Sequence, residues 1–299
     1  MRIKKLYSFA EKRNIAIGHF NVSNVETFEA AVVASRKTKR PIFLAVSEGA
    51  IRHSGLEFFV GAREYYSKKY KIELFLHLDH GMDLDIIGDA IHQGFDSVMI
   101  DGSHYEFESN IRITRSVVNQ AHRYGVFVEA ELGTIGGAEE NARAKKIIYT
   151  DPLQAQEFVA RTNCDALAVA IGTSHGIYKF LKKSAINFQL LDVLKNIIPV
   201  PLVLHGASMI DPKIVKSLQK WRVKIGHAVG VSESDLKKAI KYGIRKVNVD
   251  TDLQLVMLTE IERQIHRPHP ELKLYKILGE AGRVMEEEVI KHIKLFSSH

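Results

Sequence analysis

Three histidines close three separate strand-like runs of the chain. His80 ends the run LFLHLDH, His175 follows ALAVAIGTS, and His205 ends VPLVLHG. A single histidine beside apolar residues is more often a core residue than a ligand. Here a glycine follows each of the three, and backbone without a Cβ lets a ligand approach closely. Three imidazoles, one per strand end, suit an open catalytic zinc site, because a fourth position remains for water or substrate. The pattern predicts a metalloenzyme.

The residue before the first histidine adds a second chemistry. In HLDH, His77 and Asp79 share one strand face, while His80 points to the other face or into the following loop. Asp79 and His80 can therefore serve different tasks at one site. A carboxylate beside a metal-bound carbonyl compound is a natural base for proton removal. Zinc would polarise the carbonyl as a Lewis acid and stabilise the enediolate that forms.

The composition favours one globular enzyme in a reducing compartment. The 299 residues are 45% hydrophobic, and no stretch resembles a linker, so a single domain over 1–299 is expected. Basic and acidic residues are interspersed, so the net charge of +7 favours an anionic substrate such as a sugar phosphate over nucleic acid. The single cysteine, Cys164, excludes an internal disulfide. Neither a signal peptide nor a membrane span is expected, which predicts a cytoplasmic protein.

Eight short, almost continuously apolar runs alternate with segments of helical periodicity. Such runs are typical of parallel strands that are buried on both faces. In one intervening segment, 107–124, the apolar residues mark one helical face. This strict alternation predicts a (β/α)8 barrel, with an insertion around 209–231 and a C-terminal helical segment over 252–299. The predicted strands are 15–20, 41–47, 74–80, 97–102, 127–133, 166–172, 201–206 and 246–251.

Polar residues gather at the carboxyl ends of these runs. Barrel enzymes carry their chemistry on that face, so the side chains are expected to converge there. A doubly wound sheet would instead place its site at one switch point, and contributions from nearly every strand favour the barrel. The residues are Asn21, Ser47, Asp79, His80, Asp101, Glu131, His175, His205, Asn248 and Asp250.

Seven motifs, in order along the chain, resemble those of the class II, metal-dependent fructose-bisphosphate and tagatose-bisphosphate aldolases. The resemblance covers almost the whole chain. It implies a zinc enzyme of carbohydrate metabolism, active in glycolysis and gluconeogenesis, that forms a homodimer or a tetramer and admits a monovalent cation. The motifs are HLDHG (77–81), SVMIDGSH (97–104), VEAELG with the following GG (128–137), YTDP (149–152), GTSHGIYK (172–179), LVLHGAS (202–208) and KVNVDTDL (246–253).

The resemblance also assigns roles to individual residues. It implies that His80, His175 and His205 bind zinc and that Asp79 is the general base. Glu139 matches the acid that exchanges a proton with the aldehyde oxygen. Asp101 and Glu131 match outer or alternative metal positions, Ser47 contacts the second half of the sugar, and Asn21 is a weaker match. Phosphate and substrate contacts fall to Gly176, Lys179, Gly206, Ser208, Asn248, Asp250 and Thr251.

The chain departs from the family pattern in two places. GGAEE stands where many members have GGQED or GGEED, which keeps the key acid. KLYKIL replaces a DPRKYL-like segment, so that Tyr275 stands near the arginine expected to bind the far phosphate. Lys273, Lys276 and Arg283 are the nearby cations that could compensate.

Three other functions and a second substrate remain as alternatives. A class I aldolase needs a Schiff-base lysine at a strand end, and the fifth to seventh runs offer none. A two-metal hydrolase would carry HxHxDH, but Phe75 replaces its first histidine. A non-catalytic barrel would lack a zinc ligand or the base. Asp250 in NVDTD favours fructose 1,6-bisphosphate over tagatose-bisphosphate or another ketose phosphate, since tagatose-type members tend to have NVATE.

Overall fold

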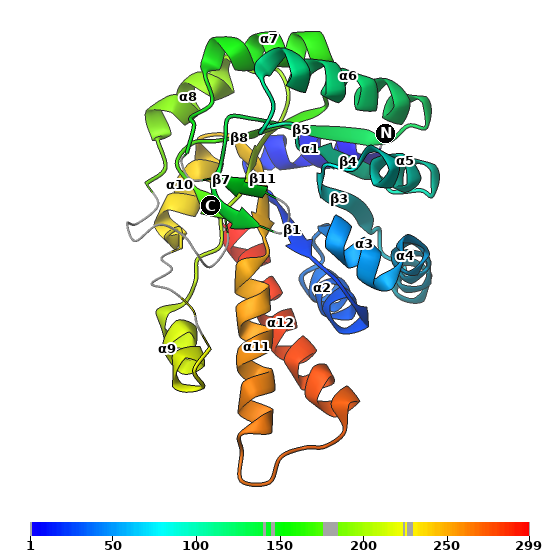
Figure 1. Ribbon diagram of the computed structural model, residues 1–299, viewed down its shortest axis with the longest axis vertical. Helices are drawn as coiled ribbons and strands as arrows, with labels where there is room; N and C mark the ends of the chain where they lie inside the picture. The colour runs from blue at the N-terminus through cyan, green and yellow to red at the C-terminus, as the bar shows by residue number, and fades with distance from the viewer. Residues whose placement is uncertain are drawn as a thin grey trace.

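Eight parallel strands close into a barrel in the computed structural model (Figure 1), in the order β1, β11, β10, β8, β5, β4, β3, β2. The predicted (β/α)8 barrel is therefore confirmed. The structure describes residues 2–139, 142–144, 147–175, 185–223, 225 and 230–298, without the side chains of 136–139, 142–144 and 175. The barrel strands are β1 Ile17–Asn21, β2 Phe43–Ser47, β3 Phe75–Gly81, β4 Ser97–Ile100, β5 Phe127–Leu132, β8 Ala166–Val169, β10 Leu202–Leu204 and β11 Ile244–Val249.

Helices connect the strands and cover the outside of the barrel (Figure 1). The apolar helix faces pack on the outward-facing strand residues, as for Ile111, Val118 and Ala121 of α6. Among the described residues, no helix is both long and apolar enough to span a bilayer. The helices are α1 Arg2–Arg13, α2 Val25–Thr38, α3 Glu48–Ser54, α4 Leu56–Tyr70, α5 Leu84–His92, α6 Phe107–Arg123, α7 Pro152–Thr162, α8 Phe188–Ile197, α9 Pro212–Lys220, α10 Glu233–Lys241, α11 Thr251–Ile265 and α12 Leu274–Phe296.

The inside of the barrel changes from apolar to polar along the strands. Every second residue of a strand faces inward, so each strand contributes successive layers. On β3 the layers are Phe75, His77 and Asp79, and on β5 they begin with Phe127 and Glu129. The lowest layer belongs to an apolar cluster that also contains the buried face of α1, with the ring of Tyr7 stacked on that of Phe127. We call this apolar half the lower lumen and the polar half above it the upper lumen.

The last barrel strand begins two residues earlier than predicted. β11 spans Ile244–Val249, whereas the sequence pattern placed the strand at 246–251. Arg245 disguised the start of the strand, because its guanidinium is buried by pairing with Glu11 and Asn14. Thr251 is instead the first residue of α11, with Asp250 before it as the capping residue.

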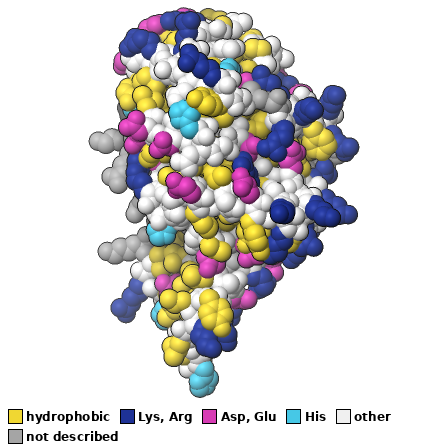
Figure 2. All heavy atoms as spheres, turned by 90° about the vertical axis from the view of Figure 1, so that its right-hand side faces the viewer, with side chains coloured by type: hydrophobic (Ala, Val, Ile, Leu, Met, Phe, Trp, Pro, Cys, Tyr) yellow, Lys and Arg dark blue, Asp and Glu magenta, His cyan; other side chains and the backbone are white. Residues whose placement is uncertain are grey.

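The predicted insertion and the predicted C-terminal segment both contain helices. The described part of 209–231 holds α9, and α9 packs on α11. The segment 252–299 holds most of α11 and all of α12, which form a long hairpin projecting from the barrel (Figure 1). Figure 2 shows hydrophobic side chains among Lys and Arg at its tapered end. Leu272 and Leu274, close to that end, are largely exposed.

A small second sheet lies at the carboxyl end of the barrel. It consists of β6 Gly136–Glu139, β7 Ala142–Ala144 and β9 Ser174–His175, in the order β7, β6, β9. β6 follows β5, and β9 follows β8, so both strands extend from carboxyl ends of the barrel. The pairing sets Gly137 opposite His175. The motifs of 128–137 and 172–179 are thus paired through their backbones.

Candidate active site

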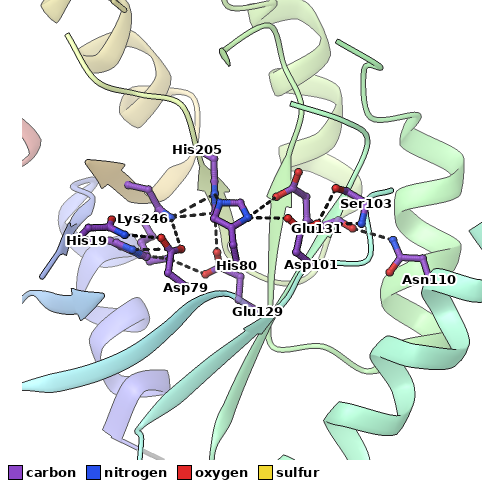
Figure 3. Close-up of polar contacts among 12 residues, drawn as sticks. His19, Asp79, His80, Asp101, Ser103, Asn110, Glu129, Glu131, His205 and Lys246 are labelled. Atoms are coloured by element: carbon purple, nitrogen blue, oxygen red, sulfur yellow. Dashed lines mark hydrogen bonds and ion pairs between the residues drawn. The ribbon is translucent and has the colours of Figure 1, made fainter. Parts of the chain in front are cut away.

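Five predicted site residues meet at the carboxyl end of the barrel (Figure 3). They come from the ends of four strands or from the residues just after them. The atoms that Asp79, His80 and His205 offer to a metal lie within 4.8 Å of one another. His80 also forms such a group with the other two residues, Asp101 and Glu131. The convergence predicted from the strand ends is therefore observed for these residues.

A bulge turns His80 into the site. The pairing of β3 with β4 shifts register between Leu78 and Gly81, and His80 has a φ of 45°, which is unusual for a residue with a Cβ. The sequence left two directions open for His80, the other strand face or the following loop, and the bulge turns its side chain into the same site as Asp79. The extra residue in the strand lets two consecutive side chains enter the same site. Such local strain is common where function demands it.

The rings of His80 and His205 present nitrogens to each other. His80 Nε2 lies 2.9 Å from His205 Nδ1. The outer nitrogens lie against carboxylates, His80 Nδ1 at 2.7 Å from Asp101 Oδ2 and His205 Nε2 at 3.0 Å from Glu129 Oε1. Because each outer nitrogen carries its proton toward a carboxylate, both inner nitrogens present lone pairs. Two facing lone pairs need a cation or a shared proton between them, so this donor set fits a divalent metal.

The carboxylate of Asp79 lies beside these histidines. Asn21 Nδ2 donates to its Oδ2 at 2.8 Å, and Asn248 Nδ2 donates to its Oδ1 at 3.4 Å. Burial alone would raise the pKa of Asp79, but the neighbouring His19, His80 and His205 hold this pKa well below its usual value. Asp79 is therefore ionised at neutral pH, as a proton acceptor must be.

Asp101 orients His80 from outside. Its Oδ1 accepts hydrogen bonds from the backbone N–H and the hydroxyl of Ser103. Burial would raise the pKa of Asp101, but His80 and Ser103 lower it, so the carboxylate stays charged. The nearer carboxylate oxygen of Glu131 lies 4.0 Å from His80 Nδ1. Both acids therefore surround the outer side of His80.

The predicted phosphate and substrate residues that the structure describes lie in loops and at the ends of strands and helices around this centre. Gly206 has a φ of 61°, and a Cβ there would stand 2.6 Å from the carbonyl oxygen of Ser174, so only glycine fits. Ser208 follows it and is buried. Asp250 and Thr251 begin α11, and Ser47 ends β2, where its hydroxyl accepts the N–H of Ala50 and caps α3. Asn248 lies against Asp79 and His205, as given above.

Four predicted residues fall outside the described side chains. The backbones of Glu139 and His175 lie in the small sheet, but their side chains are not described. Gly176 and Lys179 lie outside the described residues altogether. Their predicted roles stay predictions.

Sequence reasoning missed the middle layer of the lumen. His19, His77, Glu129 and Lys246 are all buried there, one layer below the site. Lys246 Nζ lies 2.9 Å from Glu129 Oε2 and 2.7 Å from His19 Nδ1. The signal was present, because each residue stands two positions before a residue of the site layer, as in HFN, HLD, EAE and KVN.

Burial governs the charge states of this layer. It lowers the pKa of His19 to about 4, with a further contribution from the charge of Lys246, and it lowers the pKa of His77 well below the usual value. Both histidines are therefore neutral at pH 7. Burial also lowers the pKa of Lys246 and raises that of Glu129, and each partner opposes the effect of burial on the other.

The cations near Tyr275 lie on the projecting hairpin. Tyr275 is 67% exposed near the start of α12. Lys276 pairs with Glu271 at 3.2 Å, and Arg283 pairs with Glu280 at 2.8 Å. Two of the three candidates for the missing arginine, Lys276 and Arg283, thus have acidic partners on their own hairpin.

Comparisons with known proteins identify one enzyme family. The family described as fructose-bisphosphate aldolase class-II matches residues 1–299. A fructose-bisphosphate aldolase of Thermus caldophilus is 39% identical over 97% of this chain and 95% of its own length. One of Giardia intestinalis is 38% identical over 99% of this chain and 92% of its own length. The crystal structure of the YdjI aldolase from Escherichia coli K12 has a TM-score of 0.80 and 33% identity, with 98% of this chain and 96% of that chain covered.

Proposed function

Because the chain belongs to the class II fructose-bisphosphate aldolase family, we propose that it is a zinc-dependent aldolase. Its reaction is the reversible cleavage of fructose 1,6-bisphosphate into dihydroxyacetone phosphate and glyceraldehyde 3-phosphate. One observation carries the proposal. His80 Nε2 and His205 Nδ1 face each other at 2.9 Å, and the carboxylate of Asp79 lies beside them.

The metal would be held by His80, His205 and His175. The first two supply Nε2 and Nδ1. We assign the third place to His175 because its backbone lies in β9, the strand that follows β8 at the carboxyl end of the barrel. A bound zinc ion would polarise the substrate carbonyl and favour loss of a proton from the adjacent carbon. Asp101 and Glu131 would keep His80 oriented. We further propose that the protein binds a monovalent cation as a second ion.

Asp79 is the base that removes and returns the proton on the substrate carbon. In the direction of synthesis, its carboxylate takes a proton from the hydroxymethyl carbon of dihydroxyacetone phosphate. The electron pair left on that carbon attacks the aldehyde carbon of glyceraldehyde 3-phosphate, and Glu139 gives a proton to the aldehyde oxygen. Cleavage is the reverse. Asn21 and Asn248 hold the Asp79 carboxylate in place through their amide N–H groups.

The loops around the centre would bind the sugar phosphate. Gly206 and Ser208 lie beside the metal histidine His205, where backbone N–H groups and a hydroxyl can receive a phosphate. Gly176, Lys179, Asn248, Asp250 and Thr251 complete that half of the substrate in this proposal, and Ser47 contacts the other half.

A coupled cleavage assay tests the function directly. Fructose 1,6-bisphosphate, tagatose 1,6-bisphosphate and fructose 1-phosphate are compared with and without a chelator. We expect the highest kcat/KM for fructose 1,6-bisphosphate, loss of activity with excess chelator and recovery with Zn²⁺. Full activity in excess chelator, or trapping of substrate by borohydride, would contradict the proposal, because either result indicates a Schiff-base mechanism.

We further propose that the protein works as a cytoplasmic homodimer in glycolysis and gluconeogenesis. The exposed apolar side chains near the hairpin tip, Leu272, Leu274 and Tyr275, support an interface there. Sedimentation equilibrium of the purified protein would give the mass of the assembly. A monomer at micromolar concentration would contradict the dimer.

A further inference from the structure

The buried ammonium group of Lys246 contacts two side chains, Glu129 and His19, that belong to two different parts of the site (Figure 3). We call the contacts through Glu129 to His205 the metal arm, and those through His19 to Asp79 the base arm. Lys246 Nζ is fully buried on β11 and lies 2.9 Å from Glu129 Oε2 and 2.7 Å from His19 Nδ1. Each of these neighbours contacts a different residue of the site. The other carboxylate oxygen of Glu129 contacts His205, and the other ring nitrogen of His19 lies near Asp79.

On the first arm, Glu129 decides which nitrogen of His205 faces the metal. Its Oε1 lies 3.0 Å from His205 Nε2, so that nitrogen carries the ring proton and Nδ1 keeps its lone pair. The amide nitrogen of Asn248 lies 3.1 Å from Nε2 and 3.4 Å from Nδ1. These nearly equal distances do not select one ring nitrogen. The carboxylate of Glu129 is therefore the selecting group, and Lys246 holds that carboxylate from its other oxygen.

On the second arm, Lys246 decides which nitrogen of His19 carries a proton. An ammonium group can only donate, so Nδ1 of His19 must accept, and the ring proton lies on Nε2. Nε2 lies 3.5 Å from Asp79 Oδ1, and it has no other partner among the described residues. The ring is held further by its edge-to-face contact with His77. His19 is thus set to present an N–H to the base.

We propose that Lys246 is a positioning residue that aligns the metal ligand His205 through Glu129 and the base Asp79 through His19. One group in the middle of the lumen thereby coordinates two steps that no direct contact joins: binding of the metal and removal of the proton. The role in proton removal rests on the proposed aldolase reaction. The role in metal binding needs no turnover and can be measured separately.

Three variants separate the two arms. Lys246→Met removes the charge and keeps most of the volume, Glu129→Gln alters the metal arm alone, and His19→Phe alters the base arm alone. The zinc Kd is measured by competition with a chromophoric chelator, and the absorption spectrum of the Co²⁺-loaded protein reports ligand geometry. Exchange of the dihydroxyacetone phosphate carbon proton with D₂O, followed by NMR at saturating Zn²⁺, reports the base.

The expected results differ between the variants. Glu129→Gln should raise the zinc Kd by about 10-fold to 100-fold and alter the Co²⁺ spectrum, as loss of a partner behind a ligand does. His19→Phe should leave the zinc Kd within about twofold and slow the proton exchange by about tenfold, because Asp79 loses the polar contact with His19 Nε2. Lys246→Met should do both. The first two variants carry the test if Lys246→Met does not fold.

Arg245→Met is the matched control. Arg245 is the neighbouring buried cation of β11, but it pairs with Glu11 outside the lumen. This variant should lower the Tm and leave zinc Kd, Co²⁺ spectrum and proton exchange unchanged. If Lys246→Met likewise lowers only the Tm, Lys246 is merely structural and the inference is overturned. A parent protein that binds zinc but neither exchanges the proton nor cleaves any ketose phosphate would refute the proposed function instead, and the zinc measurements would still decide the metal arm.

Discussion

The two halves of the barrel lumen are built from the same strands but do opposite work. In the lower lumen, Phe43, Phe75 and Phe127 pack with α1 into a buried apolar cluster. In the upper lumen, the next inward positions of the same strands include His77 and Glu129, which are buried yet polar. Burial of apolar groups stabilises a fold, whereas burial of charges is costly unless each is paired. The difference indicates that stability is concentrated below and chemistry above.

The largest expected effect is on the upper lumen. Asp79→Ala should lower kcat by about 10² to 10⁴, the usual contribution of general-base catalysis, and keep zinc near one per chain. His205→Ala is the contrasting variant, since it should lose the metal. Metal analysis and steady-state cleavage rates measure both. If Asp79→Ala exchanges the dihydroxyacetone phosphate carbon proton at the parent rate, Asp79 is not the base.

The lower lumen should respond in the opposite way. Phe127→Ala removes a buried ring that stacks on Tyr7, so the free energy of unfolding should fall by about 3–5 kcal/mol. Because Phe127 lies two inward positions before Glu131 on β5, away from His80 and His205, the zinc Kd of the folded variant should stay within about twofold. Urea unfolding and chelator competition measure the two quantities. A large change in the zinc Kd without a loss of stability would contradict the assignment of stability to the lower lumen and of chemistry to the upper lumen.

Asp250 tests specificity at the rim of the upper lumen. It precedes the first residue of α11, and its Oδ1 accepts a hydrogen bond from the side chain of Gln254 at 3.1 Å. We expect the parent protein to prefer fructose 1,6-bisphosphate to its tagatose epimer, and Asp250→Ala to narrow that ratio by about tenfold, the effect of one hydrogen bond. Values of kcat/KM for both sugars measure it. Equal or reversed preference in the parent would refute the assignment of substrate but leave the aldolase chemistry standing.

A smaller, pH-dependent effect is expected outside the lumen. His292 Nε2 lies 3.1 Å from Asp252 Oδ2. Burial alone would lower the pKa of His292, but Asp252 and Glu288 outweigh burial and raise this pKa. Burial alone would raise the pKa of Asp252, but His292 and two backbone N–H groups outweigh burial and lower this pKa. The stability from His292 is therefore full below about pH 6.5 and is lost as pH rises through its folded pKa. That from Asp252 is present above about pH 4 and is lost in acid.

Thermal unfolding at several pH values tests this pair. The Tm of the parent should fall more steeply between pH 6 and pH 9 than the Tm of His292→Gln, because only the parent loses the charge of His292. Parallel Tm curves for the two proteins over this range would show that the pair contributes no pH-dependent stability.

The eight strands and most of the upper site could be predicted from sequence, because buried parallel strands read as apolar runs and their polar ends converge by geometry. Three features could not. The bulge at His80 changes the direction of one side chain, and local sequence carries no clear sign of it. Arg245 hid the start of β11, because a cation buried by a distant partner looks like a loop residue. Lys246 and Glu129 looked like ordinary strand charges until the barrel brought them together.

The pairing of Asp252 with His292 also sets an order on assembly during synthesis. Asp252 accepts the backbone N–H groups of Met209 and Ile210, which fixes the loop that follows His205. Its partner His292 lies on α12, which the ribosome makes after all eight barrel strands. A nascent chain can therefore close its barrel before this loop is locked in place. The order of the loop after His205 therefore depends in part on α12, the helix that is synthesised last.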